Sequence, residues 1–228
     1  MARLLSTLLA MMLSLMACAD TPAQAPEARI LVIGDSMMTW HGISDRAVPD
    51  LLARQLGEPV INRATTAARM IYKLPVSGAA GLNIPKQFRA GPWEWIVVNG
   101  GGNDLWLGCG CHRCTRKLDR LVSEDGQTGA IPDLLTRLRA TGAQVIYVGY
   151  LRTPGRSSPI ESCRDEGTMM EERVAEFAGN DPGLHFISLV DLVPEGDLSF
   201  HTLDRIHPSV KGSRAIAARL AATIQANR

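Results

Sequence analysis

The sequence of 228 residues lacks the features of a transmembrane protein or of a nucleic-acid-binding protein. Beyond its N-terminal segment it has no apolar run of about 18 residues, so we expect no permanent transmembrane anchor. Lys and Arg number 24 against 23 Asp and Glu, and no run of like charges predicts a nucleic-acid or polybasic membrane surface. No internal repeat or low-complexity linker interrupts residues 26–228. These residues therefore predict a single domain that acts on small molecules or neutral polymers.

The N-terminal segment predicts export. Residues 1–25 have the pattern of a signal peptide, because a positively charged start precedes an apolar stretch over 4–17 that is too short to span a bilayer. Ala23-Gln24-Ala25 fits ordinary signal peptidase. Leu15-Met16-Ala17-Cys18 resembles a bacterial lipobox, which would end the signal at residue 17 and leave Cys18 lipidated. We expect a protein of the bacterial periplasm or medium, or an outer-membrane lipoprotein.

Cysteine is scarce, and apart from Cys18 the count is even: Cys109, Cys111, Cys114 and Cys163. In an exported protein this predicts two disulfides. Cys109 and Cys111 are poorly spaced to pair with each other, so we expect Cys163 to join one of the other three. The alternative is a zinc site from the same cysteines. Because export favours disulfides, we expect no metal and no other cofactor.

Apolar runs of strand type alternate with stretches of helical periodicity. The strands are predicted at 29–34, 59–62, 95–98, 145–148 and 184–189, and the helices at 48–56, 131–140, 171–178 and 209–225. This alternation predicts an α/β fold with a parallel sheet covered on both faces. The stretches 63–92, 104–128 and 150–168 are predicted as long loops, two of which hold the cysteines.

Two segments at opposite ends of the chain carry the groups of a serine site. Gly34-Asp35-Ser36 follows the first strand, which places a hydroxyl at the carboxyl edge of the sheet. Asp204 and His207 lie three residues apart before the last helix. A serine hydroxyl is a weak nucleophile until a base takes its proton, and the base must be held in the right tautomer. Ser36, His207 and Asp204 are therefore the predicted nucleophile, base and orienting acid.

Asn103 supplies the group that this set lacks, a donor for an oxyanion. It follows a glycine run after the third strand, so its amide is expected at the same sheet edge as Ser36. With Gly34-Asp35-Ser36, Gly101-Gly102-Asn103-Asp104 and Asp204-Arg205-Ile206-His207, the chain resembles the SGNH (GDSL-type) hydrolase superfamily. The resemblance implies a three-layer α/β/α, flavodoxin-like fold with five parallel strands. No G-x-S-x-G occurs, which excludes the nucleophile elbow of the α/β-hydrolases.

The resemblance also assigns roles to residues. It makes Ser36 both the nucleophile and a backbone N–H donor, and Asn103 the side-chain donor of the oxyanion hole. The third donor of such a site is usually a glycine about five residues after an Asn like Asn62. Here that position holds Ala67, whose N–H serves as well if its φ is negative. Trp106 and His41 are the candidates for contact with substrate.

The function implied by the resemblance is that of an exported serine esterase, which hydrolyses acyl or acetyl esters of small molecules or glycans through an acyl-enzyme on Ser36. The same residues would serve an O-acetyltransferase acting on an envelope polysaccharide. Two further alternatives are a carbohydrate-binding relative without catalytic activity and a zinc-dependent hydrolase built on the cysteines. The sequence carries no signal for an oligomeric state.

Overall fold

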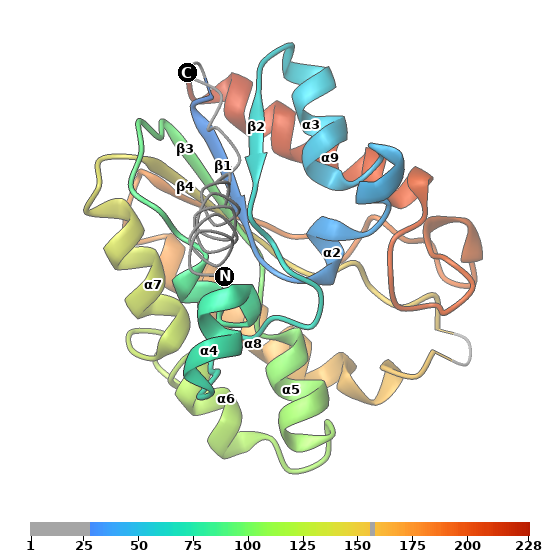
Figure 1. Cartoon of the computed structure of the whole chain (residues 1–228). Helices are drawn as coiled ribbons and strands as arrows, with labels where there is room; N and C mark the ends of the chain where they lie inside the picture. Colours follow the sequence, from blue (N-terminus) through green and yellow to red (C-terminus); the bar gives the residue numbers. More distant parts are fainter. Residues whose placement is uncertain (1–27, 156–157) are drawn as a thin grey trace, which may run out of the picture.

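The computed structural model describes residues 28–155 and 158–228, which surround a five-stranded parallel sheet (Figure 1). The strands are β1 (Ile30–Ile33), β2 (Val60–Asn62), β3 (Trp95–Val98), β4 (Gln144–Val148) and β5 (Leu184–Ile187). They lie in the order β2-β1-β3-β4-β5, and every pair is parallel. This is the flavodoxin-like order. The predicted sheet is confirmed, although β5 ends before the predicted Leu189.

Helices cover both faces of the sheet and complete three layers (Figure 1). One face carries the short α2 (Ser36–Thr39), α3 (Val48–Leu56) and α9 (Val210–Ala226). The other carries α5 (Gly102–Cys109), α6 (Thr115–Leu121), α7 (Ala130–Arg139) and α8 (Arg164–Ala178), with the single turn α4 (Pro75–Ser77) in the connection before β3. Every residue of β1 and β3 is buried, as a parallel sheet covered on both faces requires.

Two of the three predicted long loops are wrong in part. The stretch 104–128 contains most of α5 and all of α6, and α8 begins at Arg164 rather than at 171. Glycine is unfavourable in a helix interior, and Gly167 weakens the helical pattern at the start of α8. The stretch 63–92 is mostly irregular, as predicted, with short helical turns only.

The four cysteines form two disulfides, Cys109–Cys114 and Cys111–Cys163. The prediction that Cys163 joins one of the other three is confirmed, and the zinc alternative is wrong because its thiolates are consumed in the disulfides. The pairs hold the end of α5 to the start of α6 and to the turn before α8, and they are compatible with export. Within the described ranges no helix is long and apolar enough to cross a membrane. The predicted signal peptide and Cys18 lie outside the described residues.

The strand order reverses between β1 and β3, and this reversal positions the site. The two strands pair in register from Ile30 with Trp95 to Ile33 with Val98, so the segments that follow them leave the sheet side by side. Gly34 lies so close to Asn99 that an added Cβ would be 2.9 Å from the Asn99 carbonyl oxygen. In open α/β sheets such a reversal opens a crevice at the carboxyl edge, where ligands bind.

Candidate active site

The predicted serine, histidine and aspartate meet at this carboxyl edge. Ser36 begins α2 directly after β1, and its Oγ lies 2.9 Å from His207 Nε2. His207 Nδ1 lies 2.7 Å from Asp204 Oδ2. A carboxylate, an imidazole and a hydroxyl therefore form one continuous chain of hydrogen bonds between residues 171 positions apart in the sequence. This is the geometry that activation of a serine hydroxyl requires.

The loop that carries His207 is organised around the carboxylate of Asp204. Its Oδ1 accepts hydrogen bonds from the Thr202 hydroxyl at 2.7 Å and from the backbone N–H groups of Ile206 and His207 at 2.9 and 3.0 Å. Burial raises the pKa of Asp204, but the hydrogen bonds from His207, Thr202 and the backbone outweigh it and hold the pKa well below its usual value. Asp204 therefore stays ionised at neutral pH and fixes the Nδ1–H tautomer of His207.

Trp40 supports the imidazole from one side. Its ring is stacked on the ring of His207, with centroids 3.7 Å apart and planes 2° from parallel. An aromatic face so placed holds the imidazole in its plane and attracts the positive charge that the ring gains when protonated. The sequence analysis gave Trp40 no role at the site. No local sequence signal places it against a histidine near the other end of the chain.

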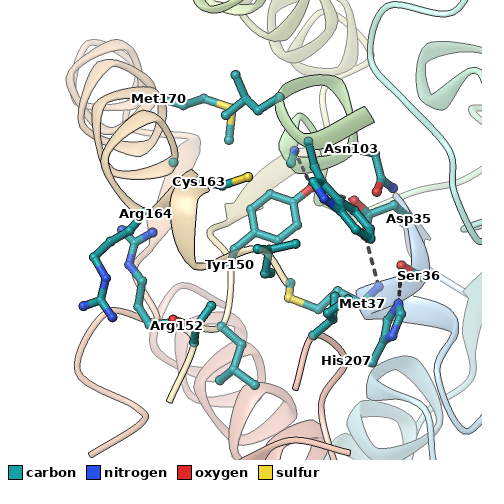
Figure 2. Close-up of a pocket in the computed structure, with 18 residues that line it drawn as sticks. Asp35, Ser36, Met37, Asn103, Tyr150, Arg152, Cys163, Arg164, Met170 and His207 are labelled. Carbon is teal, nitrogen blue, oxygen red and sulfur yellow. Dashed lines mark hydrogen bonds between the residues drawn. The ribbon is translucent and has the colours of Figure 1, made fainter. Parts of the chain in front are cut away.

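Asn103 lies in the first turn of α5, and its amide is held by the segment that follows β2. Its Nδ2 donates to the Ala68 carbonyl oxygen at 3.0 Å. The adjacent Asp104 fixes the same segment, because its carboxylate accepts the backbone N–H groups of Met70 and Ile71 at 2.8 and 2.9 Å. Burial raises the pKa of Asp104 to about 6 against the effect of those donors. Asn103 and Ser36 line the same cavity (Figure 2).

Ala67 does not meet the condition attached to its predicted role. Its φ is +62°, in the left-handed region that favours glycine, and the side chain is exposed. The Cβ of Ala67 is therefore held in a strained backbone conformation. The strain makes this position a weak point of the predicted oxyanion hole.

Tyr150 links the two halves of the site, and the sequence analysis missed it. The residue follows β4, and its hydroxyl donates to Asp35 Oδ2 at 2.5 Å while accepting the Gly102 backbone N–H at 2.9 Å. Asp35 also caps α2 by accepting the Met37 N–H at 3.0 Å. Burial raises the pKa of Asp35, and the bonds from Tyr150 and Met37 oppose that rise. One side chain therefore connects the residue before Ser36 with the residue before Asn103.

A cavity of about 100 Å³ opens beside Ser36, Asn103 and His207 (Figure 2). Trp106 lines it, as the sequence analysis expected of a substrate contact. His41 does not line it. Its Nε2 lies 3.1 Å from the carbonyl oxygen of Pro208, the residue after His207, so His41 contacts the loop that carries the base, and its contact with substrate stays a prediction.

The parallel sheet in the order 2-1-3-4-5, with helices on both faces, is the three-layer fold of the SGNH hydrolases. The GDSL-like lipase/acylhydrolase family matches residues 32–215, and the chain belongs to that family. It is therefore an enzyme that hydrolyses ester bonds. No curated protein sequence matches the chain.

Solved structures share the fold at low sequence identity. A carbohydrate acetylesterase family member from Sinorhizobium meliloti is 16% identical, with a TM-score of 0.59 over 87% of this chain and 97% of that one. Est24, a carbohydrate acetylesterase from the same organism, is 15% identical, with a TM-score of 0.56 over 89% and 100%. A candidate SGNH hydrolase from Slackia heliotrinireducens is 22% identical, with a TM-score of 0.60 over 87% and 99%.

Proposed function

We propose that the chain is an exported serine esterase that cleaves carboxylic esters through an acyl-enzyme on Ser36. The observation that carries the proposal is the hydrogen-bonded chain from Asp204 through His207 to Ser36, with distances of 2.7 and 2.9 Å. Such a chain at the mouth of a cavity supplies the nucleophile, the base and the orienting acid of acyl transfer.

In the first half of the reaction His207 Nε2 takes the proton of Ser36 while Oγ attacks the ester carbonyl carbon. The carbonyl oxygen becomes an oxyanion, which accepts hydrogen bonds from the backbone N–H of Ser36 and the amide of Asn103. The backbone N–H of Ala67, at a strained position, is the third donor proposed. The imidazolium then donates its proton to the leaving alcohol. The products of this half are the free alcohol and an ester on Ser36 Oγ.

In the second half a water molecule takes the place of the alcohol. His207 removes one of its protons as the oxygen attacks the acyl carbon, and the same donors hold the second oxyanion. Collapse returns the proton to Ser36 Oγ and releases the carboxylic acid. Asp204 stays ionised throughout and stabilises the imidazolium in both halves.

Export and the alcohol part of the substrate belong to the same proposal. The signal peptide over 1–25, or a lipid anchor on Cys18 after cleavage at 17, would deliver the chain to an oxidising compartment, and the two disulfides support this. The similarity of the fold to carbohydrate acetylesterases supports a sugar as the alcohol part.

The test compares wild type with Ser36→Ala on p-nitrophenyl butyrate and on an acylated glycan. We expect hydrolysis by wild type and a loss of about 10⁴-fold or more in kcat with Ser36→Ala. Ser188→Ala is the matched control, because Ser188 follows β5 and does not line the cavity. Hydrolysis that survives in Ser36→Ala would contradict the proposal. Transfer of the acyl group to a sugar hydroxyl in place of water would support the acetyltransferase alternative.

A further inference from the structure

The cavity beside Ser36 is walled mainly by apolar side chains. Met37, Leu105 and Trp106 lie on its wall together with Leu151, Ile160 and Met170, which come from different elements of the fold. Ser36 and His207 lie at one side, and Met170 and Cys163 lie at the opposite side (Figure 2). A group that enters from Ser36 therefore passes along apolar surface toward α8.

Gly167 leaves space on the α8 side. It lines the cavity within α8, where the backbone is helical and glycine is less favourable than alanine. A Cβ added there would meet only Arg152 Nη1, at 3.5 Å, which is ordinary contact. Gly102, by contrast, needs to be glycine, because its Cβ would lie 2.7 Å from the Tyr150 ring. Packing requires glycine at Gly102 but not at Gly167, although Gly167 lines the cavity.

The two arginines on the wall do not make this an anion site. Arg152 pairs with the buried Glu171, with Nη2 3.0 Å from Oε2, and Arg164 Nε donates to Glu161 Oε1 at 2.8 Å. Each guanidinium thus has its own carboxylate. With their charges paired and most of the wall formed by apolar atoms, the cavity suits an uncharged, hydrophobic group.

We propose that this cavity binds the acyl part of the substrate, and that Gly167 leaves room for a straight aliphatic chain longer than acetyl. The proposal rests on the proposed function, since it needs Ser36 as the nucleophile. A cavity of 150 Å³ binds benzene, with six carbons, so about 100 Å³ holds about four carbons beyond the carbonyl. The substrates are therefore esters of short fatty acids, of about four to five carbons, rather than acetyl esters or long-chain lipids.

The size of the effect follows from burial of methylene groups. Each buried methylene improves binding about fourfold, so butyrate esters should exceed acetate esters in kcat/KM by about 15-fold. The gain in kcat/KM ends once the acyl chain fills the cavity. Esters of ten or more carbons should fall below pentanoate by about tenfold or more, because their chain must leave the cavity or strain its walls.

The test measures kcat/KM for p-nitrophenyl esters of two to twelve carbons in wild type, Gly167→Ala and Gly167→Leu. Filling the cavity should lower the rate with pentanoate by about threefold in the alanine variant and more than tenfold in the leucine variant, and leave acetate within about twofold. Glu172→Leu is the control, because it adds the same side chain to an exposed position of α8. The alanine variant tests the proposal even if the leucine variant does not fold.

A binding measurement separates this proposal from the proposed function. Ser36→Ala is titrated with acetate, butyrate, pentanoate and decanoate by calorimetry, with and without Gly167→Leu. Tighter binding of pentanoate than of acetate, lost with Gly167→Leu, supports the acyl pocket whether or not the wild type hydrolyses esters. An enzyme with equal rates on acetate and pentanoate, unaffected at Gly167, overturns the acyl pocket and leaves the serine esterase standing. No hydrolysis and no chain-length preference in binding overturn both.

Discussion

Replacing Tyr150 by Phe tests whether one side chain holds the two halves of the site together. The change keeps the ring and removes the hydroxyl, which donates to Asp35 at 2.5 Å and accepts from the Gly102 N–H at 2.9 Å. Loss of a hydrogen bond to a buried carboxylate costs about 2 kcal/mol and loss of the second bond about 1 kcal/mol. For a domain of this size the sum of about 3 kcal/mol lowers Tm by about 6–12 °C.

The same variant should slow the chemical step. Asp35 precedes Ser36 and Gly102 precedes Asn103, so loss of the link lets the nucleophile and the oxyanion donor shift against each other. A misplacement well under 1 Å should lower kcat about tenfold and leave KM within about twofold. Tyr72→Phe is the matched control, because its hydroxyl contacts only Ser77 at 3.0 Å and the residue does not line the cavity.

The stability loss in Tyr150→Phe should also depend on pH. Burial raises the folded-state pKa of Asp35, so ionisation of this carboxyl destabilises the fold as pH rises through that pKa. The Tyr150 hydroxyl favours the ionised form. Its removal should therefore cost most at high pH, where Asp35 is ionised, and least at low pH, where Asp35 is protonated. An unchanged kcat together with a lowered Tm would show that Tyr150 is purely structural. A loss of stability that does not depend on pH would refute the role of Asp35.

Three further changes test other parts of the site. Ala67→Gly removes the strain of a positive φ, so it should raise the free energy of unfolding by about 1 kcal/mol and leave kcat equal or higher; a large loss of kcat would contradict the backbone role. Asn103→Ala should lower kcat about 10²–10³-fold with an unchanged fold by circular dichroism, and near-normal kcat would remove it from the oxyanion hole. Reduction of Cys111–Cys163, which closes a separation of 52 residues, should lower the free energy of unfolding by about 3–4 kcal/mol in denaturant titrations, and an unchanged midpoint would argue against the pairing.

The sequence was sufficient for the sheet and for the residues of the hydrogen-bonded chain. Runs such as Ile30–Ile33 and Trp95–Val98 are apolar throughout and rich in β-branched residues, which is typical of short strands buried on both faces. Ser36 lies in the motif Gly34-Asp35-Ser36, and Asp204 and His207 lie in the motif Asp204-Arg205-Ile206-His207, so each could be recognised from the sequence. The structure brings them together as expected, while their catalytic roles stay predictions.

The residues that the sequence analysis missed make their important contacts with residues far away along the chain. Trp40 stacks on His207, and Tyr150 contacts Asp35 across 115 positions of the chain. No local pattern distinguishes these aromatic residues from ordinary core residues. Gly167 had a different effect: a glycine inside α8 weakens the helical pattern, so the sequence analysis placed the start of this helix too late.

The most direct measurement is site-resolved mass spectrometry after reaction with a fluorophosphonate, which phosphonylates activated serines. The account predicts that the label falls on Ser36 in the wild type. His207→Ala should abolish it because the serine is then no longer activated, and the Ser188→Ala control should leave it unchanged. Labelling of a different residue, or labelling of Ser36 that persists in His207→Ala, would contradict the central claim.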